Sequence, residues 1–147
     1  MRATTRFWIA ASVALLGFAD PTCAQESSYV PGTVWVLSSI KTEPGQSENY
    51  LDFLDKTWKK INEMAKKEGY VVSYHVLQQT NARENEPDLM LVVEYKDFLT
   101  NSQRLEFQKK LEALLSTDSH RADTQAGERK TMRKVAGDME LQELNLK

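Results

Sequence analysis

The stretch GTVWVLSSIKTEPGQSENYLDFL, residues 32–54, decides the fold, because a strand, a turn and the start of a helix follow one another directly. β-branched and aromatic residues dominate positions 32–42, a composition typical of a strand. Pro44-Gly45 is then a turn signal. Beyond the turn, apolar residues recur every three or four positions, the period of an amphipathic helix. These residues are Leu51, Leu54, Trp58, Ile61 and Ala65.

Start and stop signals bound this helix. Ser47 can cap its first turn, and Glu48 suits the positive end of the helix dipole. Gly69 can end the helix in a left-handed conformation that other residues adopt less easily. The sequence therefore predicts a strand at 32–42 followed by a helix at 47–68.

The rest of the chain continues the alternation of strand and helix patterns. Thr100 and Gln103 have the spacing of a capping box, which marks the start of a second helix. The polar stretch 117–131 lacks a sustained period, and we predict a long loop there with one helical turn at 121–126. The other predicted elements are strands at 70–80 and 88–98, the second helix at 100–116 and a last strand at 132–144.

The order strand, helix, strand, strand, helix, strand predicts a ferredoxin-like α+β fold, with one antiparallel sheet and two helices on one face. The strand at 88–98 is apolar on both faces apart from Glu94. For this carboxylate we expect either a partner such as Arg133 or an exposed position. A sheet with one face in water alternates more cleanly, so we expect a second copy of the chain to cover the other face.

The order of elements, the apolar second face and the opening VWVLSSIKTEPGQSENYLDFL together resemble the dimeric α+β barrel superfamily. Its members include antibiotic-biosynthesis monooxygenases, haem-degrading monooxygenases, polyketide cyclases and stress-responsive barrel proteins. The resemblance covers residues 32–144. It implies a homodimer joined through its sheets and a pocket in each subunit between sheet and helices. It implies no single function, because this superfamily contains enzymes and non-enzymes alike.

The leading functional hypothesis is that such a pocket binds a small apolar or aromatic ligand. Tyr50 and Trp58 on the first helix and Tyr74 on the second strand would line the pocket. Arg83, in the loop after that strand, would close over its mouth and attract an anionic ligand. The alternative interpretation of the three aromatic side chains is ordinary core packing.

His75 is the catalytic candidate, and two further functions stay open. Alternation places His75 opposite the bulkier set that we expect to face the helices, which is Tyr70, Val72, Tyr74 and Val76. A cofactor-free monooxygenase or a cyclase-like enzyme could use His75 with a tyrosine such as Tyr95. A structural dimer without a ligand is the third possibility. The sequence does not identify the ligand or decide whether the protein is an enzyme.

The sequence predicts no cofactor, no metal and no nucleic-acid partner. Haem-degrading members of the superfamily resembled here use a histidine on the second helix, and residues 102–116 contain none. His120 with Asp118 and Asp123 is a poor metal set, because a catalytic zinc usually takes three protein ligands. The net charge is −2, and the short lysine pairs have acidic neighbours. Such patterning is typical of solvated faces.

Residues 1–24 have the pattern of a signal peptide, with Arg2 and Arg6 ahead of an apolar run and a small-residue site at Thr22-Cys23-Ala24. The run is about 13 residues long, whereas a membrane-spanning helix needs about 20. We therefore expect cleavage after Ala24, a periplasmic or secreted protein and no membrane attachment. Cleavage would remove the only cysteine. Residues 25–31 would form a tail, and residues 32–147 would form a single domain.

Overall fold

The computed structural model describes residues 26–147. The signal peptide and its cleavage site, expected within residues 1–24, lie outside this range. No helix in the described part is both long enough and apolar enough to cross a membrane. The elements in chain order are β1 (Tyr29–Thr42), α1 (Ser47–Phe53), η1 (Leu54–Trp58), α2 (Lys59–Lys67), β2 (Val71–Gln78), β3 (Leu89–Tyr95), α3 (Asn101–Leu115), α4 (Ser119–Glu128), η2 (Arg129–Thr131) and β4 (Arg133–Leu146).

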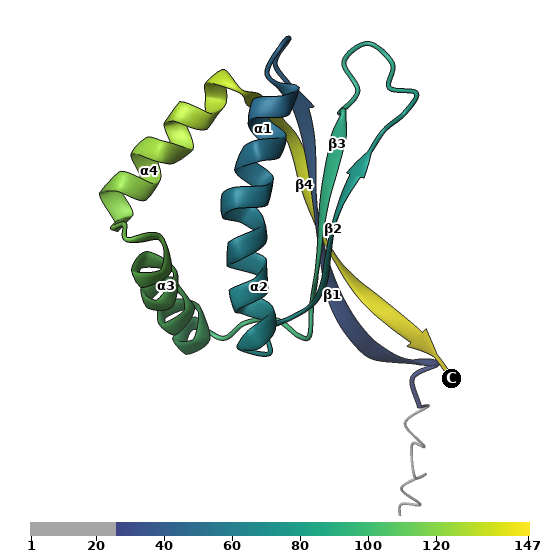
Figure 1. Cartoon of the computed structure of the whole chain (residues 1–147). Helices are drawn as coiled ribbons and strands as arrows, with labels where there is room; N and C mark the ends of the chain where they lie inside the picture. Colours follow the sequence, from purple (N-terminus) through teal and green to yellow (C-terminus); the bar gives the residue numbers. More distant parts are fainter. Residues whose placement is uncertain (1–25) are drawn as a thin grey trace, which may run out of the picture.

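The four strands form one antiparallel sheet in the order β2-β3-β1-β4. This order and the sequence of elements are those of the ferredoxin-like α+β fold, as predicted. All helices lie on one side of the sheet (Figure 1). β1 begins at Tyr29, three residues earlier than expected, because Tyr29, Val30 and Pro31 pair with the end of β4.

The predicted first helix is continuous from Ser47 to Lys67 and contains a π-helical segment, η1, in its middle. Gly69 follows it with a φ of 78°, the left-handed conformation that favours glycine. Gln46, rather than Ser47, is the residue before the first turn, and it makes no side-chain cap. Asn62 is buried and donates to the Trp58 carbonyl at 2.8 Å, which satisfies a polar group within the helix.

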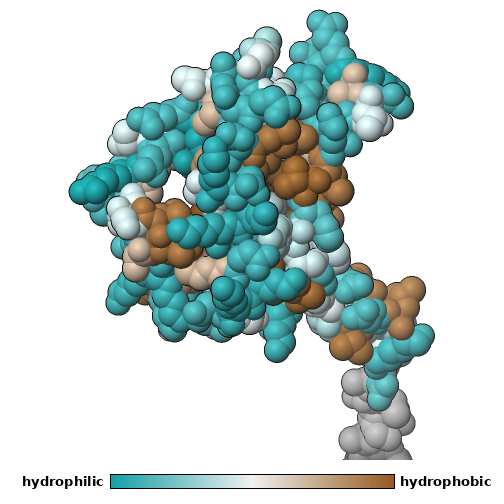
Figure 2. All heavy atoms as spheres, viewed as in Figure 1, coloured by the Kyte–Doolittle hydropathy of each residue, from teal (hydrophilic) through white to brown (hydrophobic). Residues whose placement is uncertain are grey.

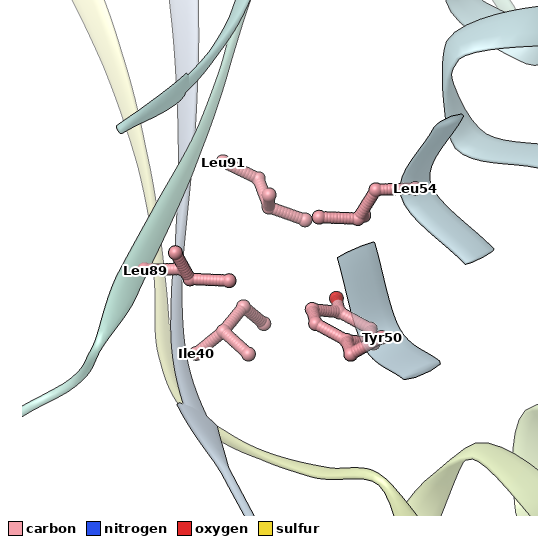
Figure 3. Packing of buried hydrophobic residues seen from close by; sticks show 5 residues of the cluster. All are labelled: Ile40, Tyr50, Leu54, Leu89 and Leu91. Carbon is pink, nitrogen blue, oxygen red and sulfur yellow. The ribbon is translucent and has the colours of Figure 1, made fainter. Parts of the chain in front are cut away.

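Two clusters of buried residues join this helix to the sheet. In the first cluster, Tyr50 and Leu54 of the helix meet side chains of β1 and β3 (Figure 3). The strand residues in it are Ile40, Leu89 and Leu91. The second cluster consists of Ala65, Val71 and Val93, with Phe107 of α3 packed against it. The space between the sheet and the first helix is therefore filled by side chains.

Two local expectations are wrong for identifiable reasons, and a third, the partner of Glu94, is met by a different residue. A bulge between Val71 and Ser73 puts Val71 into the core, so Val72 is exposed instead of facing the helices. The segment predicted as a loop forms α4, because Asp118 caps it by accepting from the Arg121 amide at 3.0 Å. Arg133 does not pair with Glu94, which accepts instead from the Ser73 hydroxyl at 2.7 Å.

The sheet face that points away from the helices carries apolar side chains on all four strands. The strand register puts Trp35 and Leu37 of β1 on this face, beside Met90 and Val92 of β3. Leu77 of β2 and Met139 and Leu141 of β4 extend the surface and are about half exposed. We call these seven residues the open sheet face. No element among residues 26–147 covers it (Figure 1).

Asp88 connects the entrance of β3 to the end of β1. Its carboxylate accepts from the Thr42 amide and hydroxyl, both at 2.8 Å, and pairs with Lys41 at 3.0 Å. Burial alone would raise the pKa of Asp88, but the hydrogen bonds from Thr42 and the pairing with Lys41 outweigh it. The pKa therefore lies below its ordinary value.

We expect Asp88→Asn to lower the free energy of unfolding by about 1 kcal/mol at pH 7, because charge-assisted hydrogen bonds at a partly exposed site are lost. A carboxylate with a lowered folded-state pKa stabilises above its unfolded pKa and loses this contribution as the pH falls through the folded pKa. The difference between wild type and variant should therefore shrink below about pH 3.8. Urea denaturation at pH 7 and at pH 3 measures both values. Asp52→Asn, in a surface pair with Lys56, is the control and should change stability less.

Candidate functional site

A cavity of about 390 Å³ lies between the first helix and the layer formed by α3 and α4. It is on the far side of the first helix from the sheet, and the space-filling view is hollowed between α4 and α1 (Figure 2). We call it the helix cavity. Its lining residues are Phe53, Thr57, Ile61, Leu111, Leu115, Ala122, Gln125, Glu128, Arg129 and Met132. Its volume falls within the range of small-molecule sites.

The cavity exists because α3 and α4 pack loosely against the rest of the molecule. Neither helix has a fully buried residue. α3 begins at the capping box predicted for Thr100 and Gln103, and it contacts the core mainly through Phe107. The Phe107 ring meets the Tyr70 ring edge to face, with centroids 5.8 Å apart. Side chains from three helices therefore surround a space that none of them fills.

Two arginines lie beside a pair of aromatic rings at one end of this cavity. The Arg129 guanidinium carbon is 4.9 Å from the centroid of the Phe53 ring. The Phe53 ring stacks on Tyr50, with centroids 5.9 Å apart and an interplanar angle of 18°. The Arg133 guanidinium carbon is 5.6 Å from the centroid of the Tyr50 ring. Arg129 and Phe53 line the cavity directly, whereas Tyr50 and Arg133 lie behind them.

Within residues 26–147, the two guanidinium groups lack acidic partners. Among residues 26–147, the ion pairs include neither Arg129 nor Arg133. The Nε atoms of both side chains are buried and have no hydrogen-bond acceptor in this part of the chain. Burial and the positive charge of Arg133 both hold the pKa of Arg129 below its ordinary value. The local potential at this end of the cavity is therefore positive.

The Tyr50 hydroxyl is embedded in the same cluster. Burial raises its pKa, and the nearby charges of Arg133 and Arg129 offset part of that rise. Only 1% of the residue is exposed. Tyr50 is therefore a protonated phenol at neutral pH. Its ring stacks on Phe53, and each of these two rings contacts one of the two arginines.

Of the four residues predicted to bind a ligand, the structure brings three into one layer. Tyr50 belongs to the first core cluster, and Trp58 packs against both clusters. Trp58 meets Tyr74 edge to face, with centroids 5.4 Å apart, and the Tyr74 hydroxyl donates to Glu63. Arg83 lies apart from them in the hairpin loop, where its side chain is 88% exposed and pairs with Glu86. Their role in ligand binding stays a prediction.

His75 lies on the same side of the sheet as the open sheet face and is exposed. It pairs across the strands with Val92, whereas Tyr95 has the opposite parity on β3 and packs against the second core cluster. The sheet therefore separates His75 from Tyr95, and the suggested pair of these two residues does not form. No side-chain hydrogen bond orients His75 within the described range.

His120, Asp118 and Asp123, which the sequence marks as a poor metal set, do not form a cluster of potential ligands in the described residues. No group of three His, Cys, Asp or Glu side chains within residues 26–147 is close enough to hold a metal ion. His120 instead lines a shallow groove on the outer side of α4, and Asp118 caps the start of that helix. A smaller hollow of about 240 Å³ lies between the sheet and the loop after β3. Its lining mixes acidic and basic groups, among them Asp97, Arg104 and Glu140.

Sequence analysis missed Phe53, Arg129 and the α4 residues that line the helix cavity. In the sequence, Phe53 is one more apolar residue of the first helix, and Arg129 falls in the segment predicted as a loop. One signal was available: Arg129 and Arg133 are spaced four apart and flank Met132 at the entrance of the last strand. Without the knowledge that 119–131 is helical, this spacing could not be placed beside Tyr50 and Phe53.

Comparisons with known proteins do not identify the function. No family model and no curated protein matches the sequence. Among solved structures, PA3566 from Pseudomonas aeruginosa is 12% identical, with a TM-score of 0.43 and coverage of 79% of this chain and 96% of that chain. A NipSnap family protein of unknown function from Agrobacterium tumefaciens is 11% identical, with a TM-score of 0.45 and coverage of 79% and 90%.

Substitutions at Tyr50 test whether this residue acts mainly in the core. We expect Tyr50→Ala to lower the free energy of unfolding by about 3 to 5 kcal/mol, because it opens a cavity in the first cluster. Tyr50→Phe removes only the hydroxyl and should cost about 1 kcal/mol. Urea denaturation followed by circular dichroism measures both values. Equal and small effects of the two substitutions would contradict a core position.

Proposed function

We propose that this protein binds a small apolar or aromatic ligand in the helix cavity. The observation that carries the proposal is an unfilled space of about 390 Å³ lined by side chains of α1, η1, α2, α3 and α4. A space of this size with apolar walls is the usual form of a ligand pocket. The sequence hypothesis placed the pocket between sheet and helix, and the proposal moves it one layer outward.

The chemistry of the lining favours binding over catalysis. The apolar side chains that face the cavity are Phe53, Ile61, Leu111, Leu115, Ala122 and Met132. The polar groups are few, and Thr57, Gln125, Glu128 and Arg129 supply them. A few polar groups in an apolar pocket orient a ligand and select it. Within the described residues, the lining contains no histidine or cysteine that could serve as a base or a nucleophile.

The enzyme alternative places the chemistry at His75, on the opposite side of the sheet. A general base needs a partner that orients it and a pocket that holds the substrate. The open sheet face has neither in a single subunit. The structural alternative, a dimer without a ligand, requires the helix cavity to remain empty. Ligand binding is therefore the function that the geometry supports best.

We also propose that two subunits associate through the open sheet face. Its side chains are apolar on every strand, including β4, whose apolar residues Met139 and Leu141 lie on this face. β4 directs the polar residues Asp138, Glu140 and Gln142 toward the helix side instead. A contiguous apolar face of this kind is typical of an interface. A two-fold related copy of the same face is its simplest complement.

Filling the helix cavity tests ligand binding. We expect 1-octanol, a neutral apolar probe, to bind the wild-type chain and to raise its melting temperature, because a ligand that binds only the folded state stabilises it. Ala122→Phe inserts a ring into the cavity and should abolish this shift while leaving the fold intact. Ala113→Phe, on the exposed side of α3, is the matched control and should keep the shift. Octanol binding that survives Ala122→Phe would contradict the proposal.

Substitution on the open sheet face tests the dimer. We expect size-exclusion chromatography with light scattering to show a dimer for the wild-type chain at micromolar concentration. Met139→Glu should convert it to a monomer, because a carboxylate buried in an apolar interface is strongly unfavourable. Leu105→Glu, at a residue of α3 that is 62% exposed, is the control and should remain dimeric. A wild-type monomer would overturn the proposed assembly.

A further inference from the structure

We propose that the ligand of the helix cavity is an apolar acid whose carboxylate is held by Arg129, with Arg133 supplying a second positive charge behind it. This inference rests on the proposed ligand binding and specifies the chemical class of the ligand. It would make the site selective for a negatively charged end group on an apolar body.

Arg129 has an N–H donor without an acceptor in the described part of the chain. A guanidinium group has five N–H donors in a planar fork that matches a carboxylate. The Arg129 side chain is partly buried, and its buried Nε finds no acceptor within residues 26–147. Contact with the Phe53 ring attracts the positive charge, but a ring face does not replace oxygen acceptors for the fork. The Arg129 fork therefore has hydrogen-bonding capacity that the described part of the chain does not satisfy.

The positive charges of Arg129 and Arg133 are not compensated by acidic residues within residues 26–147. Arg129 and Arg133 repel one another, and the ion pairs of the described residues include neither. Glu128 is the one acidic residue of the cavity lining, but it makes no ion pair with Arg129 and also lines the outer groove of α4. Even a partly buried charge without a partner carries a desolvation cost that no ion pair offsets. An anion at Arg129 would supply the missing partner for both guanidinium groups.

The position of Arg129 in the cavity suits an acid with an apolar body. Arg129 lies in the cavity lining together with Phe53, Leu115 and Met132. The apolar body of a ligand whose carboxylate binds Arg129 would therefore lie against apolar side chains. Arg133 is not among the residues that line the cavity, and its guanidinium lies over the Tyr50 ring, which stacks on Phe53. It therefore acts through its charge and by holding the ring stack in place, not through contact with the ligand. The two arginines should accordingly contribute unequally to binding.

Three probes with the same eight-carbon chain and different end groups test the inference on the full chain at pH 7: octanoate, 1-octanol and octylammonium. We expect isothermal titration calorimetry to show octanoate binding at least about tenfold more tightly than octanol, because hydrogen bonds to charged groups are strong. Octylammonium should bind more weakly than octanol. Arg129→Gln should remove the tenfold preference for octanoate, and Arg133→Gln should reduce it about two- to fivefold.

Control variants separate a specific contact from general electrostatics. Lys130→Gln removes the same charge from the exposed residue between the two arginines and should leave the preference for octanoate unchanged. Arg129→Lys keeps the charge but not the fork, and it should recover part of the preference. Circular dichroism establishes that each variant is folded. If Arg129→Gln does not fold, Arg129→Lys carries the test, and an unchanged preference in that variant overturns the contact with the fork.

The outcomes distinguish this inference from the proposed function. Octanol that binds as tightly as octanoate, or an undiminished preference in Arg129→Gln, overturns the anionic class while ligand binding in the cavity stands. Absence of binding by all three probes overturns the proposed function and this inference with it. A preference for octanoate that falls equally in Lys130→Gln and Arg129→Gln overturns the specific role of Arg129.

Discussion

The packing of one long helix, Ser47–Lys67, on the central strands determines where every other part of the molecule can lie. Tyr50 and Leu54 meet Ile40, Leu89 and Leu91 in a cluster that leaves little space. Because this helix packs directly on the sheet, α3 and α4 lie on its far side, and α3 reaches the core mainly through Phe107. The layered arrangement leaves one cavity behind the helix and one sheet face without a covering element in residues 26–147. Both proposals about function follow from this asymmetry.

Much of the fold could be predicted from the sequence because its signals are local. The Pro44-Gly45 turn, the apolar period of the first helix, the left-handed Gly69 and the capping box at Thr100 each depend on neighbouring residues. The order of elements then permits few topologies. Predictions failed where distant partners or weak local patterns decide the outcome. The bulge that turns Val72 outward depends on the pairing of β2 with β3. α4 has a capping residue but only a short amphipathic pattern, so its polar composition suggested a loop.

The candidate site was less predictable than the fold for the same physical reason. Tyr50, Trp58 and Tyr74 were recognised as one aromatic group, and the structure does place them in one layer. Which side of the helix contains open space depends on how closely α3 and α4 approach, and no local pattern encodes that distance. Arg83 and Arg129 are both basic residues of segments predicted as loops. Only the tertiary structure shows that one is solvated beside Glu86 and the other is held against Phe53.

The arginine cluster is the feature of the helix cavity that packing alone explains least. An aromatic stack such as Tyr50 with Phe53 is stable without charged neighbours, and apolar side chains of similar volume often replace buried charges without loss of stability. Cation–π contact offsets part of the desolvation of each guanidinium. It leaves two like charges near one another, and their Nε donors have no acceptor within residues 26–147. An anion bound from solution would satisfy both the charge and the donors. The positive charge at one end of an otherwise apolar cavity is therefore a physical reason to expect a ligand, in addition to the empty volume itself.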